Sequence, residues 1–171
     1  MVAWQRQSEH TEILFRLSLP IIGSTELKIQ VSWTISTNSS KTSLGPEKYL
    51  SDVQDPQRRQ TQAKFRLSDH KLAVETLRYA RPKVEYDNRK CPLCQTEVEN
   101  EIHLLFNCSW AGYADIGKTF EIKMVGLVKN YEFLHATDKA AYLMIQENKE
   151  ILNSVADYIA SLFSTRNQQL R

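Results

Sequence analysis

The sequence of 171 residues is poor in cysteine, with three, and it contains only five glycines and five prolines. Its apolar runs are short, and none approaches the roughly 18 residues that a membrane-spanning helix needs. No apolar segment follows a basic start, so we expect an intracellular chain, nuclear or cytoplasmic, that is not secreted and has no membrane partner. An odd number of cysteines in a reducing compartment does not favour a disulfide framework.

Sequence patterns for catalysis are also absent. A polymerase palm needs a Tyr-x-Asp-Asp turn and a further aspartate to hold two divalent ions, whereas this chain has no Asp-Asp pair. It has neither a Gly-rich phosphate loop nor a Gly-x-Ser-x-Gly nucleophile elbow. His70 is expected to be a surface or helix-capping residue rather than a general base. We therefore predict that the protein is not an enzyme and has no small-molecule substrate.

What the chain does contain is a concentration of metal-binding residue types. All three cysteines and one of the four histidines fall within 18 residues, in the pattern C-x2-C-x8-H-x4-C. Two residues between Cys91 and Cys94 let both thiolates face one ion, and His103 and Cys108 are expected on adjacent turns of one helix face. Three sulfurs and one imidazole leave no open coordination position, so the sequence predicts a structural zinc site with Zn2+ as its cofactor. The alternative is that the cysteines are small buried hydrophobic residues without a metal.

Positive charge is concentrated just before this motif. Ten basic and four acidic residues between positions 58 and 90 give +6, and the net charge of +2 for the chain leaves −4 for the remainder. A basic block beside a zinc knuckle predicts a surface that contacts phosphates, with several members on one exposed helix face. The alternative is a solvated helix face without a partner. The predicted nucleic-acid-binding residues are Arg58, Arg59, Lys64, Arg66, Lys71, Arg78, Arg81, Lys83, Arg89 and Lys90.

Hydrophobic periodicity divides the chain at about residue 45. Residues 27–35 alternate apolar and polar side chains, as a half-buried strand does, and residues 13–19 are a second candidate strand. A short β-hairpin is therefore expected near the N-terminus. Residues 37–45 are rich in Ser, Thr, Asn and Gly, which indicates a linker. We accordingly expect an N-terminal segment over residues 1–45 and a helical zinc-binding domain over residues 46–171.

Helical patterns fill the second part of the chain. Pro46 is expected near the start of a first helix, and a basic helix over about residues 57–67 follows it. Ser68 and Asp69 are predicted to cap a further short helix. Other predicted helices lie at residues 98–108, after residue 137 and over residues 151–163, the last with an amphipathic repeat. The predicted fold is mainly α: a small helical domain built around a CCHC zinc knuckle.

Three segments in order carry a family resemblance. They are residues 65–82 (FRLSDHKLAVETLRYARP), residues 89–108 (RKCPLCQTEVENEIHLLFNC) and residues 138–166, which begin DKAAYLM. Together they resemble the C-terminal zinc-binding region of non-LTR (LINE-type) retrotransposon reverse transcriptases, over about residues 46–168. The chain departs from that pattern at Leu77, where many relatives have glycine, and it lacks the arginine that often follows soon after the position of Tyr113.

The resemblance implies a region that grips an RNA template or target DNA while a polymerase acts, without a polymerase or endonuclease active site of its own. We therefore expect a zinc-stabilised nucleic-acid-binding module, with a retroelement protein as a further partner. Two alternatives stay open. One is a zinc-stapled protein-interaction module, and the other is a retroelement remnant with no selected activity. A steep salt dependence of oligonucleotide binding separates the first reading from the other two.

Overall fold

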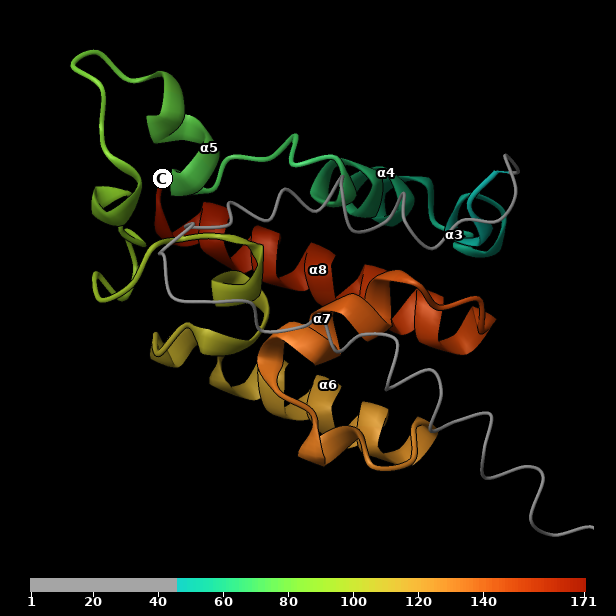
Figure 1. Cartoon of the computed structure of the whole chain (residues 1–171). Helices are drawn as coiled ribbons and strands as arrows, with labels where there is room; N and C mark the ends of the chain where they lie inside the picture. The colour runs from blue at the N-terminus through green and yellow to red at the C-terminus, as the bar shows by residue number, and fades with distance from the viewer. Residues whose placement is uncertain (1–45) are drawn as a thin grey trace, which may run out of the picture. The chain divides into compact units, whose positions relative to one another are not determined.

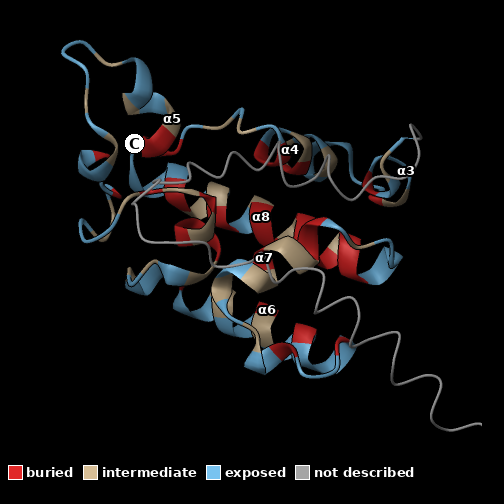
Figure 2. Ribbon diagram, in the orientation of Figure 1, coloured by how far each residue is buried: buried red, intermediate tan, exposed pale blue. Residues whose placement is uncertain are grey.

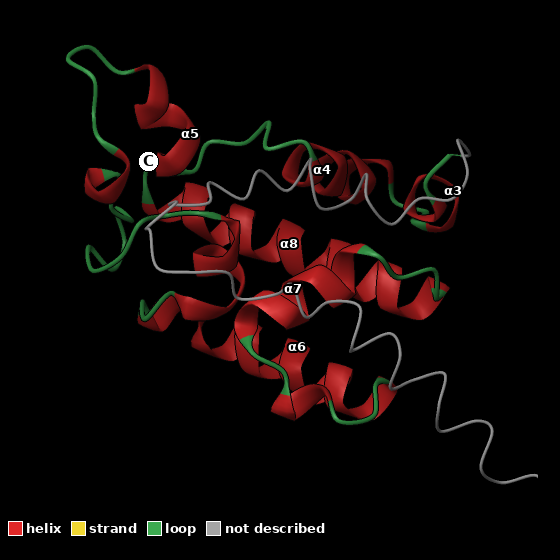
Figure 3. Cartoon of the chain, in the orientation of Figure 1, coloured by secondary structure: helices red, strands yellow, loops and turns green. Residues whose placement is uncertain are grey.

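The computed structural model describes residues 46–171, and these residues are mainly helical (Figures 1 and 3). Among them no strand occurs, and only an isolated antiparallel bridge joins Lys90 to Val98. The predicted mainly α class is therefore confirmed, whereas the hairpin and the linker predicted within residues 1–45 lie outside the described residues. The elements in chain order are α3 (Lys48–Asp52), α4 (Pro56–Arg66), α5 (Ala73–Thr76), η1 (Leu77–Tyr79), η2 (Tyr86–Asn88), η3 (His103–Asn107), η4 (Ala111–Tyr113), α6 (Ala114–Leu127), η5 (Tyr131–Phe133), α7 (Ala136–Met144) and α8 (Lys149–Gln169).

Helix α8 is the element on which the others pack. It begins at an asparagine cap, because Asn148 Oδ1 accepts hydrogen bonds from the backbone N–H groups of Glu150 and Ile151. Its buried residues recur every three or four positions and face α3, α4, α6 and α7 (Figures 1 and 2). The amphipathic helix predicted over residues 151–163 is confirmed, and it extends further at the C-terminal end.

Helix α4 is the basic helix that the sequence predicts, within one residue at each end. Pro56 occupies its first position, where a missing N–H costs nothing, and Asp55 Oδ1 accepts from the N–H groups of Gln57 and Arg58. Phe65 turns inward from its last turn and is fully buried. The local start signals were therefore sufficient to place this helix.

The segment between α4 and α5 corrects one prediction. Ser68 and Asp69 do not cap the following helix; they close α4. Ser68 has a left-handed backbone with φ 54°, and its N–H donates to the Phe65 carbonyl. The Asp69 N–H donates to the Lys64 carbonyl at 2.8 Å, which completes a Schellman-type ending. Helix α5 starts later, at Ala73.

Most buried apolar residues form one cluster shared by α4, α6, α7, α8 and η3. Met124, Tyr131, Leu143 and Ile159 are fully buried within it. A smaller cluster, formed by Tyr49, Val53, Leu152 and Ala156, packs α3 against α8. None of the helices within residues 46–171 combines the length and the apolar character needed to cross a membrane.

Candidate metal centre

The first two cysteines lie on a tight turn between two short extended segments. The Cys91 N–H donates to the Glu97 carbonyl at 2.9 Å, and the Glu99 N–H donates to the Arg89 carbonyl at 3.0 Å. The turn itself is closed by a bond from the Gln95 N–H to the Cys91 carbonyl, with Gln95 at φ 60°. Both thiols therefore come from one end of a small hairpin, as the spacing predicts.

His103 is the first residue of η3 and Cys108 directly follows its end, and here the structure differs from the expected helix. The two residues are five positions apart, so an α-helix would place them about 140° apart around its axis. Element η3 is instead a π-helix, and the Cys108 N–H donates to the His103 carbonyl at 2.8 Å. Such i→i+5 bonding widens the turn, so residues five apart return to nearly the same side. The wider turn, rather than adjacent α-helical turns, brings the last two side chains together.

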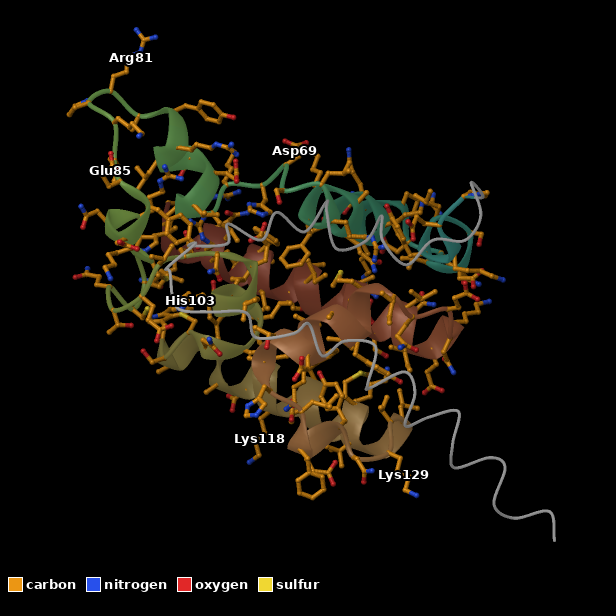
Figure 4. All side chains as sticks on the ribbon, viewed as in Figure 1. Asp69, Arg81, Glu85, His103, Lys118 and Lys129 are labelled. Atoms are coloured by element: carbon orange, nitrogen blue, oxygen red, sulfur yellow. The ribbon has the colours of Figure 1, made fainter. Side chains whose placement is uncertain are left out.

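The four side chains converge on one point (His103 is labelled in Figure 4), and their ligand atoms all lie within 4.8 Å of one another. Cys91 Sγ lies 3.9 Å from Cys108 Sγ, and Cys94 Sγ lies 3.4 Å from His103 Nε2. A tetrahedral ion with metal–sulfur bonds of about 2.3 Å separates its ligand atoms by about 3.5 to 3.8 Å. A disulfide would need about 2.05 Å, and all three cysteines are free. The donor set and its spacing thus fit a tetrahedral metal ion.

Neighbouring polar groups orient these ligands. The Glu97 carboxylate lies 3.2 Å from His103 Nδ1, so a proton on Nδ1 leaves Nε2, the nitrogen that faces Cys94, as the metal-binding atom. The Thr96 hydroxyl donates to Cys94 Sγ at 3.2 Å. A carboxylate behind a ligand histidine and a donor on a thiolate are the arrangement that holds metal ligands in position.

The three cysteines have different tendencies to ionise. Burial raises the pKa of Cys108 to about 12, and the charges of Cys91 and Cys94 act in the same direction. Burial would also raise the pKa of Cys94, but hydrogen bonds from Thr96 and the backbone outweigh it and lower that pKa to about 6. Three thiolates this close are mutually repulsive, and a cation between them favours the ionised forms.

A second carboxylate, Glu99, connects this centre to the rest of the fold. It is 1% exposed. Arg166, in the last part of α8, donates from Nε and Nη2 to its two oxygens at 2.6 and 2.8 Å. The same carboxylate accepts from the Ala73 N–H at the start of α5 at 2.6 Å, and the Cys91 thiol lies 3.8 Å away. Glu99 therefore joins a ligand cysteine, α5 and α8.

Two of the basic residues predicted to contact nucleic acid are buried, which corrects the prediction for them. Arg66 is 8% exposed and Arg89 is 5% exposed. The Arg66 guanidinium donates to the Met144 carbonyl at 2.6 Å and pairs with Glu47 at 3.1 Å. The Arg89 guanidinium donates to backbone carbonyls, including that of Val74 at 2.9 Å. Neither side chain can reach a phosphate without leaving these partners.

The remaining predicted residues do not share one helix face either. Arg58 pairs with Asp55 and with Asp157 of α8, and Arg59 donates to the Val53 carbonyl. The Arg58 side chain is still 48% exposed, so its ion pairs contribute little to the fold, whereas Arg59 is half-buried. The other members of the predicted set are exposed: Lys64, Lys71, Arg78, Arg81, Lys83 and Lys90.

His70 is a further correction, because it lies neither at the surface nor at a cap. Its side chain is 3% exposed, and Nε2 lies 3.0 Å from the Glu101 carboxylate. The ring packs against those of Phe65 and Phe163, with centroids 5.9 and 6.1 Å away, and the two phenylalanine rings also contact each other at 6.2 Å. A single histidine next to an aspartate in a polar stretch gives no sign of such a position, since Glu101 and Phe163 come from distant parts of the sequence.

Sequence reasoning missed Tyr79, which the structure places at the surface. It is 76% exposed, and the Arg78 guanidinium lies 5.7 Å from its ring centroid. The basic residues around it in the sequence were the available signal, because exposed aromatic rings beside cations are typical of surfaces that stack nucleobases.

Comparison with protein-family models, with curated proteins and with solved structures returned no match for this chain. The retrotransposon resemblance therefore stays a prediction.

Proposed function

We propose that this chain is a zinc-stabilised, non-catalytic module that binds single-stranded RNA or DNA. The donor set supports zinc binding, because it consists of three soft thiolates and one imidazole, supplied by Cys91, Cys94, His103 and Cys108. Thiolates favour zinc over magnesium, calcium or manganese, and four protein ligands fill its tetrahedral shell, which is typical of a structural site. The metal would hold the knuckle in shape, and binding would take place on the surface beside it.

The observation that carries the nucleic-acid proposal is the composition of one exposed segment, residues 78–83. It leaves the helical body after α5 and returns toward the knuckle (Figure 1), and Arg81 points away from the rest of the protein (Figure 4). Arg78, Tyr79, Arg81 and Lys83 are all exposed. Three cations and one open aromatic ring within six residues combine phosphate contacts with a stacking surface.

The acidic neighbours of this segment do not prevent such binding. Arg78 lies 3.5 Å from Glu75, and Lys83 lies 3.4 Å from Glu85. The side chains of Lys83 and Glu85 are 70% and 72% exposed, and exposed ion pairs of this kind contribute little free energy. Both cations can therefore exchange a carboxylate for a phosphate at small cost.

The test measures binding of the zinc-loaded chain to a fluorescent 20-nucleotide oligo(U) and oligo(dT) over a range of salt concentrations. Tyr79→Ala removes the stacking ring and should weaken binding about 5- to 100-fold, since stacking contributes about 1–3 kcal/mol per base. Arg81→Glu with Lys83→Glu should flatten the slope of log affinity against log salt by roughly 1.4, for two lost phosphate contacts on a single strand.

Lys123→Glu with Lys129→Glu is the matched control, because it reverses two exposed lysines outside residues 78–83. The proposal requires that this control bind like the unchanged chain, and that all variants keep their metal content and circular dichroism. Failure of the unchanged chain to bind either oligonucleotide at low salt would overturn the proposal. If Lys123→Glu with Lys129→Glu lost as much oligonucleotide affinity as Arg81→Glu with Lys83→Glu, binding would depend only on net charge.

A further inference from the structure

The outer face of α6 carries apolar side chains where a surface helix ordinarily carries polar ones. The inner face is well packed, with Phe120 and Met124 buried in the main core. On the outside, Ile122 is 65% exposed and Val125 is 43% exposed. Three positions separate these two residues, so they are neighbours on one face of the helix.

Element η5, next to α6, carries a further exposed apolar residue. It packs against α6 and is held by Tyr131, which is fully buried. Phe133, two residues later, is 77% exposed. Apart from the neighbours of Gly126 in the chain and the backbone of its own helix, no atom lies within 4 Å of the position that a side-chain carbon on Gly126 would occupy, so no other element covers the helix there. A group of adjoining exposed apolar residues, unlike a single one, indicates a contact surface.

Exposed lysines bracket the apolar pair. Lys118 lies within α6, four positions before Ile122, and Lys129 follows Val125 by four positions, two residues beyond the end of α6. Both lie at the lower edge of the protein in Figure 4, and Lys123 is exposed as well. Within residues 46–171 none of the three forms an ion pair, whereas Lys139 nearby pairs with Glu121.

We propose that this face, formed by Lys118, Ile122, Val125, Lys129 and Phe133, binds an amphipathic helix of a partner protein whose apolar stripe is bracketed by acidic residues. The apolar centre would be buried against the partner, and the lysines at both ends would select the sign of its charges. This α6 face is separate from residues 78–83, so the inference does not rest on the proposed nucleic-acid binding.

The arrangement of charges distinguishes this partner from a second copy and from a lipid surface. Antiparallel pairing of two α6 faces would bring Lys118 of one copy against Lys129 of the other, and parallel pairing would align identical lysines, so both are repulsive. A flat anionic membrane would also meet Glu132, which adjoins Phe133 and is exposed.

The experiment uses the full, zinc-loaded chain and a synthetic helical peptide. The peptide carries two leucines three positions apart, with a glutamate four positions before the first and another four positions after the second. A second peptide has lysine at both glutamate positions. The glutamate peptide should bind at least about tenfold more tightly than the lysine peptide, and Ile122→Ser should weaken its binding by about tenfold or more.

Two controls match the chemistry. Leu67 is 66% exposed, nearly the same as Ile122, so Leu67→Ser should leave peptide binding unchanged. Lys118→Glu with Lys129→Glu should reverse the preference between the two peptides, whereas Lys64→Glu with Lys71→Glu should not. Because all four lysines are exposed, every variant should melt within about 2 °C of the unchanged chain.

Three outcomes would overturn the proposal. Equal affinity for both peptides would show that charge does not select the partner. Binding to phosphatidylserine vesicles that Ile122→Ser abolishes, without peptide binding, would assign the face to a membrane. A large loss of melting temperature in Ile122→Ser, absent in Leu67→Ser, would show that the face is already covered within the folded chain.

Discussion

We expect single side chains outside the candidate ligand set to affect metal binding, and Glu97 is the clearest case. Its carboxylate lies 3.2 Å from His103 Nδ1, yet the Glu97 side chain is 59% exposed. We expect Glu97→Ala to lower metal affinity about 10- to 100-fold, because the ring loses the partner that fixes its orientation and its proton. The affinity is measured by competition with a coloured chelator.

Glu85→Ala provides the control, since it removes another exposed carboxylate, one that pairs only with Lys83 among the described residues. It should leave metal affinity unchanged. An equal affinity in Glu97→Ala and Glu85→Ala would mean that something other than Glu97 orients the histidine.

Glu101 gives a prediction about pH. Burial would raise its pKa, but the hydrogen bond and charge of His70 outweigh burial and hold that pKa below its usual value of 4.5. A carboxyl with a lowered folded-state pKa stabilises the fold above its unfolded-state pKa, and this contribution disappears as the pH falls through the folded value. The difference in unfolding free energy between the unchanged chain and Glu101→Gln should therefore narrow as the pH falls below about 4.5.

Urea titrations at a series of pH values supply this difference. Comparing the two chains at each pH cancels the loss of metal that acid causes in both. A difference in unfolding free energy that stays constant down to pH 3 would contradict a stabilising interaction between His70 and Glu101.

These individual residues also show what the sequence could and could not reveal. The four ligands were found because their spacing is local and their residue types are rare in the chain. The burial of Arg66 could not be found that way, because it depends on the Met144 carbonyl, 78 residues away. Glu99 was missed for the same reason: its partner Arg166 lies 67 residues further along. An arginine or a glutamate alone gives no sign of whether it meets a phosphate, water or a buried counter-charge.

Among the elements, α4 and α8 were predicted well because capping residues and apolar periodicity mark helices directly. The π-helix η3 was not, since its pattern of apolar residues does not distinguish a wide turn from an α-helical one. Only the requirement that His103 and Cys108 meet one ion favours the wider turn. Helix α5 was misplaced because Ser68 and Asp69 are equally suited to begin a helix or to end one.

The connection between α8 and the knuckle depends on the Glu99–Arg166 pair. Both side chains are buried, and the charge of Glu99 overcomes the effect of burial to raise the pKa of Arg166. Arg166→Ala should destabilise the protein by about 3–5 kcal/mol, because it leaves a buried carboxylate without its counter-charge. The double variant Glu99→Gln with Arg166→Met should lose less stability than Arg166→Ala, since no buried charge remains unpaired.

Urea unfolding of the three chains, all zinc-loaded, gives the comparison. A double variant that is less stable than Arg166→Ala would show that hydrogen bonding by Glu99 matters more than the pairing of charge.

Across the described part of the chain, we expect the proposed metal and the apolar core to stabilise different regions. Between Leu77 and Val98 only Arg89 and Cys91 are buried, so this stretch has little apolar packing of its own. Helices α4, α6, α7 and α8 share the main core. Removing the metal with a chelator should therefore release residues 77–98 first and leave much of the helical signal in place.

Amide hydrogen exchange before and after chelation tests this. Exchange should accelerate strongly at the knuckle and change least in the middle of α8. Complete loss of the helical circular dichroism signal on chelation would show instead that the helical core does not stay folded without the metal.

The position of Arg166 near the end of the chain affects how the metal centre can be studied. A synthetic peptide covering residues 89–108 contains all four ligands, but it lacks the counter-charge that Glu99 meets in α8. Truncation before residue 166 would remove that counter-charge as well, although it lies 58 positions beyond the last ligand. We therefore expect metal affinities measured on such fragments to be lower than the affinity of a chain that includes Arg166.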